Sequence, residues 1–220
     1  PSHAQDKNTK THATPVLLEL FTSQGCSSCP PAEKTVTELA EHDPNLIVLT
    51  FHVDYWDRLG WKDPYGSAAF SNRQRQYARN RGDRKVYTPQ IVVNGQSHVV
   101  GSQPEQVFDA IERVRGNTIK PLLIEATMHG TEATIAILSD SLSSLTPSKI
   151  KLTLAVVQDG ISSNVKAGEN SGRQLQHSAV ARSLKSAIVK SSASNIRHTL
   201  KLPTDVIGKP LRAIVFAQDS

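Results

Sequence analysis

Cysteine is scarce in this sequence: its 220 residues include only two, Cys26 and Cys29. A zinc site built from four thiolates is therefore excluded within a single chain. The sequence also lacks a run of about twenty apolar residues, so we expect no part of it to span a membrane. Zinc knuckles, phosphate-binding loops and basic segments interleaved with aromatic residues are missing as well. We therefore expect no nucleic-acid partner.

The two cysteines lie between an apolar run and an amphipathic segment. Residues 16–21 are typical of a buried strand, and residues 22–25 of the turn that follows it. From residue 32 to residue 40, apolar residues recur at helical spacing. The pair is thus expected at a helix N terminus, where unpaired backbone N–H groups and the helix dipole favour a thiolate over a thiol.

This position favours redox chemistry. We assign Cys26 as the attacking thiol, because the residue nearer the helix start is expected to face solvent, and Cys29 as the resolving thiol. One alternative is a copper or zinc site in which a histidine, such as His52 or His98, completes the cysteine pair. A second alternative, an inert structural disulfide, is the weakest interpretation, because a bridge that closes so short a loop restrains little unfolded-chain entropy. We assign no cofactor and no metal ligand.

The rest of the first 116 residues alternates between strands and helices. In order, the patterns predict a strand at 46–53, a helix at 68–80, strands at 91–93 and 98–100 joined by an Asn-Gly turn, and a helix at 104–115. This order, with a cysteine pair after the first strand and a proline before the third, resembles the thioredoxin fold. The resemblance implies that Pro89 is cis, lies beside the disulfide and shapes the substrate groove, and that Thr88 packs against the cysteines.

A closer resemblance rests on longer motifs. They are FTSQGCSSCPPA at 21–32, HVDYWD at 52–57, LGWKDP at 59–64, YTPQ at 87–90 and GENSGR at 168–173. With these motifs the chain resembles an uncharacterised family of bacterial secreted thioredoxin-like proteins, the domain of unknown function 1223. The similarity extends over nearly the whole chain. It implies a thioredoxin-like fold and export from the cytoplasm.

Glu19 is the one charged residue in the first predicted strand. If a helix covers its face of the sheet, Glu19 is a buried carboxylate with a raised pKa, able to take a proton from Cys29 during exchange. If it lies near an edge, it is solvated or paired with an arginine.

Aromatic residues gather after the second predicted strand. The aromatic residues Tyr55, Trp56, Trp61 and Tyr65 are expected to form a wall beside the disulfide that receives a substrate. Gln24 and Gln90, beside the cysteines and the proline, are expected to contribute to the same binding site. The alternative is a satellite cluster that packs a long loop.

The stretch from Arg73 to Lys85 is strongly basic, in line with the formal net charge of +5. Its partner would be an acidic protein or an anionic membrane surface. The ordinary alternative is a solvated helix face.

Strands dominate after residue 116. We expect an α/β thioredoxin-like domain at 15–116, a mixed sheet flanked by helices, and a β-rich, sandwich-like domain at 117–220 packed against it. A helix is predicted within 173–190. The loop with Glu169, Asn170 and Arg173 is interpreted as a tight structural turn in preference to a flap over the disulfide.

Residues 1–14 are polar and expected to be disordered, and Ser2-His3-Ala4 resembles the end of a signal peptide. We therefore expect a periplasmic or secreted protein whose export signal has been removed. The function predicted from the sequence is thiol–disulfide exchange on protein or small-thiol partners. Two alternatives remain: metal delivery through the same cysteines, and a non-catalytic binding module on a thioredoxin scaffold.

Overall fold

The computed structural model describes residues 14–116, 121–138, 149–193 and 196–218. The expected disordered segment therefore lies, except for Thr14, outside the described residues. In the N-terminal half the elements are β1 (Val16–Thr22), α1 (Cys29–His42), β2 (Leu46–His52), the 3-10 helix η1 (Asp54–Leu59), α2 (Ala68–Arg81), β3 (Gln90–Val93), β4 (Ser97–Val100) and α3 (Pro104–Val114). Each strand and helix predicted in this half is confirmed, with ends that differ by a few residues.

The C-terminal half is built mainly from strands. They are β5 (Ile124–His129), β6 (Glu132–Ile137), β7 (Lys149–Gln158), β8 (Ile161–Asn164), β9 (Gln174–His177), β10 (Val180–Lys190), β11 (Ile196–Lys201) and β12 (Leu211–Gln218), with the 3-10 helix η2 (Thr204–Val206) before the last. The helix predicted within 173–190 is wrong. Its residues form β9 and β10, and β10 pairs with β7 along its length. Good helix formers here follow tertiary pairing instead of local propensity.

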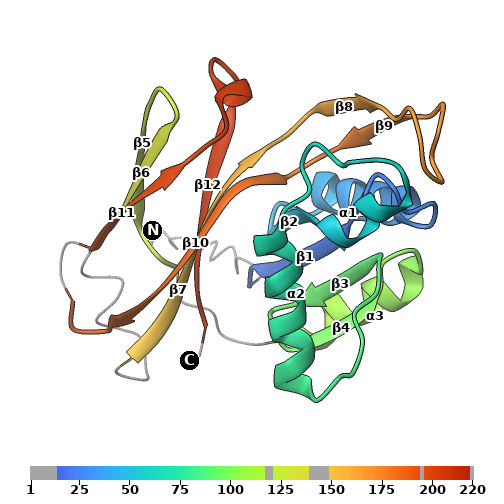
Figure 1. Ribbon diagram of the computed structural model, residues 1–220. Coiled ribbons are helices and arrows are strands. Elements are labelled where there is room, and N and C mark those ends of the chain that lie inside the picture. The colour runs from blue at the N-terminus through green and yellow to red at the C-terminus, as the bar shows by residue number, and fades with distance from the viewer. Residues whose placement is uncertain (1–13, 117–120, 139–148, 194–195, 219–220) are drawn as a thin grey trace, which may run out of the picture.

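One mixed sheet runs through both halves, in the order β12-β7-β10-β2-β1-β3-β4. β1 and β2 are parallel, β3 and β4 continue the sheet antiparallel, and β10 joins it beside β2. In Figure 1 the helices surround β1 to β4, whereas β5, β6 and β11 lie at the far end of the molecule. The division expected at residue 116 stays a prediction about folding units, but strands from both sides of it share this sheet.

Two apolar clusters cover the two faces of the helical end of the sheet. Alternate residues of β1, including Leu18 and Leu20, face α1 and α3. Phe21 and the residues on its side of the sheet face α2 and the C-terminal strands. Because both faces are covered, β1 is apolar along nearly its whole length. A third cluster joins the β11-β6-β5 sheet to β7 and η2. Among the described residues, the structure has no helix of the length and apolarity that a membrane crossing requires.

Candidate functional site

Cys26 and Cys29 form a disulfide at the start of α1, with their Cα atoms 5.4 Å apart. The helix begins at Cys29, and its first turn contains Pro30 and Pro31, which need no intrahelical N–H partner there. The turn before it closes as the Cys29 amide donates to the carbonyl oxygen of Cys26. The predicted placement of the pair at a helix N terminus is confirmed.

The loop before β3 lies against the first cysteine. The Thr88–Pro89 peptide bond is cis, as the resemblance implied, and the Thr88 hydroxyl donates to Cys26 Sγ at 3.4 Å. The indole Nε1 of Trp56 donates to the same hydroxyl oxygen at 2.8 Å. Since Trp56 satisfies the Thr88 oxygen as an acceptor, the hydroxyl hydrogen is free to point at the sulfur. Trp56 therefore orients the group that contacts Cys26.

Both cysteines are fully buried, so the expectation that Cys26 faces solvent is wrong. The backbone around the disulfide is held by a distant loop between β8 and β9, which we call the cover loop (residues 165–173). The Asn170 amide donates to the carbonyl oxygens of both Gln24 and Cys26, each at 2.9 Å. The Glu169 carboxylate accepts from the backbone N–H of Ser27 at 2.9 Å. This contact lowers the pKa of Glu169.

The cover loop is itself a tight turn. Arg173 donates to the side-chain oxygen of Asn170, and the Gly172 amide donates back to Val165. Gly168 adopts a left-handed conformation (φ +74°), and a Cβ there would lie 3.2 Å from the Cβ of Trp61, so glycine allows the close approach. The structural turn and the flap over the disulfide, interpreted above as alternatives, are the same feature.

Gln24 ties this cover to the rest of the site. Its buried side chain accepts from Trp61 Nε1 at 2.9 Å and donates to Ser163 of β8 at 2.9 Å. Its backbone N–H donates to Asp63. Gln24 thus joins the disulfide turn, the aromatic loop and the β8–β9 hairpin, and no part of its side chain faces open surface.

Tyr55 and Gln90 lie in a neighbouring network. The Tyr55 hydroxyl donates to Gln74, whose amide donates to the buried Gln90 side chain. Burial raises the pKa of Tyr55 to about 12, so the phenol is protonated at neutral pH. Substrate binding by these residues, and by Gln24, Trp56 and Trp61, stays a prediction.

Glu19 lies away from the disulfide. Its carboxylate is fully buried and accepts from Arg73 Nε at 2.5 Å and from the Tyr77 hydroxyl. Strand alternation places it on the side of the sheet that faces α2, opposite α1. Of the two environments expected for Glu19, the structure combines burial with an arginine partner. Arg73 is consequently internal and does not belong to a basic surface.

A second group of buried polar residues lies under the β8–β9 hairpin. His52, at the end of β2, contacts Asp63 through Nδ1 at 2.7 Å, and His177, at the end of β9, contacts Glu33 of α1 through Nδ1 at 2.5 Å. Burial alone lowers the pKa of His52, but the charge and hydrogen bond of Asp63 outweigh it and leave that pKa raised. The pKa of Asp63 is lowered, because the His52 interaction outweighs its own burial. Sequence analysis missed Glu33, Asp63 and His177.

Comparisons with known proteins identify a family without identifying an activity. The family described as "Protein of unknown function (DUF1223)" matches residues 17–218. A crystal structure of a protein from Agrobacterium tumefaciens is similar with a TM-score of 0.64 and 29% identity, covering 90% of this chain and 82% of that one. HBP35 of Porphyromonas gingivalis is similar with a TM-score of 0.53 and 14% identity, covering 95% of this chain and 65% of that one. A search of curated proteins finds no match.

Proposed function

We propose that this chain, which belongs to the DUF1223 family of proteins of unknown function, is a thioredoxin-like protein that exchanges disulfides through Cys26 and Cys29. The observation that carries the proposal is the disulfide at the first turn of α1, with the Thr88 hydroxyl directed at Cys26 Sγ. Polar donors around a sulfur are what a thiolate requires, whereas a purely structural bridge has no use for them.

The order of events follows from the contacts. In the reduced protein the Cys26 thiolate attacks one sulfur of a substrate disulfide, forming a mixed disulfide and releasing one substrate thiolate. The Cys29 thiolate then attacks Cys26 Sγ, which re-forms the Cys26–Cys29 bond and releases the second substrate thiolate. Thr88 supports Cys26 as the first nucleophile, because its hydrogen bond stabilises negative charge on that sulfur. The reverse sequence oxidises a dithiol substrate.

Exchange requires the cover loop to open. Neither sulfur is exposed while Asn170 and Glu169 hold the loop on the disulfide turn, so a substrate reaches Cys26 only after these contacts break. Opening also uncovers Trp61, which lies beside Gly168 of the loop, and this supports its predicted contact with substrate. The proposed setting is extracytoplasmic, with protein or small-thiol partners.

The reduction potential of the pair tests this function. The protein is equilibrated in glutathione buffers, and the fraction with a reduced Cys26–Cys29 pair is measured by mass spectrometry. We expect a reversible couple between roughly −120 and −270 mV, the range of thiol oxidoreductases. A potential below about −300 mV, or an irreversible couple, would identify a structural bridge and leave the binding-module alternative.

A trapping experiment then tests the roles of the two cysteines. Cys29→Ala is expected to accumulate a mixed disulfide with a model peptide disulfide, because no resolving thiol remains. Cys26→Ala is the matched control and should trap far less. Equal trapping by both variants contradicts the assignment of Cys26 as the attacking thiol.

A further inference from the structure

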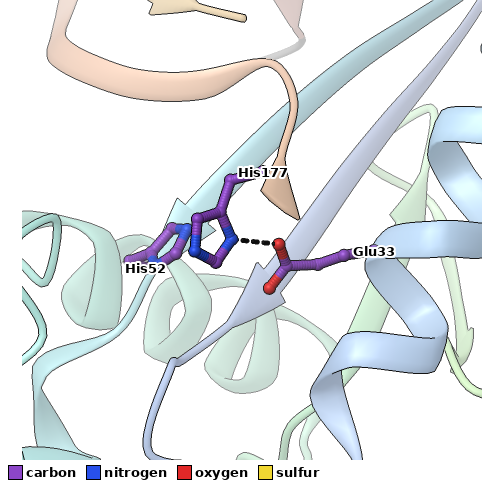
Figure 2. Close-up of side chains that lie close together, drawn as sticks. All are labelled: Glu33, His52 and His177. Atoms are coloured by element: carbon purple, nitrogen blue, oxygen red, sulfur yellow. Dashed lines mark hydrogen bonds and ion pairs between the residues drawn. The ribbon is translucent and has the colours of Figure 1, made fainter. Parts of the chain in front are cut away.

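The second buried group contains three potential metal ligands from three distant segments. They are Glu33 on α1, His52 at the end of β2 and His177 at the end of β9, and none has a side chain more than 6% exposed. Figure 2 shows the His177 ring between the other two side chains. One ligand atom from each lies within 4.8 Å of the others. Within the described ranges this is the one such group, and it contains neither cysteine.

His52 is the member whose bonding is incomplete. Its Nδ1 is engaged with Asp63, which also accepts from the backbone of Gln24. Its Nε2 is buried and has no hydrogen-bond partner. A buried polar atom without a partner is destabilising, whether it is a neutral acceptor or a protonated donor. A metal ion would satisfy this atom.

The surroundings match those of metal ligands elsewhere. A ligating histidine commonly donates its other ring nitrogen to a carboxylate, and Asp63 supplies that contact to His52. Ligating carboxylates are themselves hydrogen-bonded, and Thr22 donates to the free oxygen of Glu33 at 2.8 Å. Two histidines and one glutamate form a set that holds zinc, with a fourth position left for water.

We infer that Glu33, His52 and His177 form a binding site for a divalent transition metal of the zinc class, separate from the disulfide. Bonds of about 2.0–2.1 Å bring tetrahedral ligand atoms to roughly 3.3 Å from one another. Small side-chain rotations therefore have to widen the 2.5 Å contact between Glu33 and His177, whose hydrogen bond the ion replaces. They also have to shorten any separation above roughly 3.3 Å, the present limit being 4.8 Å. Bound there, it ties the β8–β9 hairpin to α1 and β2.

A surface groove borders one ligand of the site. A groove of about 470 Å³ lies between α1 and β9, and Glu33 belongs to its lining together with Glu38 and Glu41. Lys34 and Arg173 also line it, so its charge is mixed and the carboxylates are in a small excess. Because Glu33 lines the groove and both histidines are buried outside its lining, we expect an arriving cation to meet Glu33 first.

Zinc binding to the purified protein tests the inference. After treatment with EDTA, the protein competes for Zn²⁺ with a chromophoric chelator. We expect one equivalent to bind the wild type, and the Cys26→Ser/Cys29→Ser variant to bind it with a Kd within about threefold, because no thiolate takes part. His52→Gln should weaken binding at least 100-fold. His98→Gln is the matched control, a strand histidine outside the group, and should leave the Kd unchanged.

Three results would overturn the inference: no saturable equivalent in the wild type, loss of binding in the double cysteine variant, or unchanged binding in His52→Gln. Loss of zinc binding in the double cysteine variant would identify the thiolates as the metal ligands. If His52→Gln does not fold, anomalous density at the zinc edge in crystals of the wild type decides. A peak among Glu33, His52 and His177 supports the site, and its absence there refutes it. Neither result depends on thiol exchange.

Discussion

Replacing Asn170 with alanine should expose the disulfide without touching it. The Asn170 amide makes two hydrogen bonds to the carbonyls of Gln24 and Cys26, and its side chain is fully buried. At about 1 kcal/mol each, their loss destabilises the closed cover loop by about 2 kcal/mol. Since 1.4 kcal/mol is a factor of ten, the open population rises about 30-fold.

The assay is the rate at which a small phosphine reductant cleaves the bond. When opening and closing are fast, this rate follows the open population, so Asn170→Ala should be reduced about 30 times faster than the wild type. Gln176→Ala is the matched control, because Gln176 lies on the same hairpin and its side-chain amide donates to Ser162 of β8, not to the disulfide turn. Rates within threefold of the wild type for Asn170→Ala, or equal acceleration by the control, would refute the assignment of the loop as a cover.

Three further predictions concern single contacts. The hydrogen bond from Ser27 lowers the pKa of Glu169, so the carboxylate holds the cover loop fully above pH 4.5, its ordinary pKa, and releases it as the pH falls through the lowered value. The rate of phosphine reduction, normalised to that of a short peptide disulfide, should therefore rise as the pH falls below 4.5. Glu19→Gln leaves Arg73 buried without its counter-ion, so the free energy of unfolding in urea should fall by about 3–5 kcal/mol. Thr88→Val removes a donor that the Cys26 thiolate needs more than the disulfide does, so the reduction potential should fall by about 20 mV, equivalent to about 1 kcal/mol.

Each of these predictions has a matched control. Glu169→Gln should abolish the pH dependence of reduction, and its persistence would assign the effect to another group. Glu38→Gln breaks an exposed helix pair with Lys34 and should cost less than about 0.5 kcal/mol, so a similar loss in Glu19→Gln would refute the buried ion pair. Thr88→Ser keeps a hydroxyl and should retain the wild-type potential.

The N-terminal elements were predictable because their signals are local. β1 is a short apolar run, α1 has apolar residues at helical spacing, and Asn94-Gly95 specifies the hairpin between β3 and β4. The helix predicted within 173–190 was wrong for the opposite reason, as residues 180–190 show. Their alanine, arginine, leucine and lysine side chains suit a helix, and only the pairing with β7, invisible in the local sequence, makes the segment a strand.

The same contrast between local signals and distant contacts explains which residues of the site could be predicted. Cys26, Cys29, Thr88 and Pro89 are recognised from short motifs. The contact between Glu33 and His177 joins residues 144 positions apart, so no local sequence pattern predicts it. A weak signal existed: Glu33 is four residues after Cys29, which places both on one helix face.

The β8–β9 hairpin supplies His177, which sequence analysis missed because the hairpin lies far from the cysteines in the chain. It also keeps the two proposed functions, disulfide exchange and metal binding, separable. It contributes Asn170 from its loop to the disulfide turn, and His177 from the end of β9 to Glu33. Gln24 hydrogen-bonds to both residues, through its carbonyl to Asn170 and its amide to His177. The loop contacts can break while the strand contact stays, so opening for exchange does not require the metal ligands to part. A protein in which Asn170→Ala accelerates reduction while zinc affinity is retained would show this division directly.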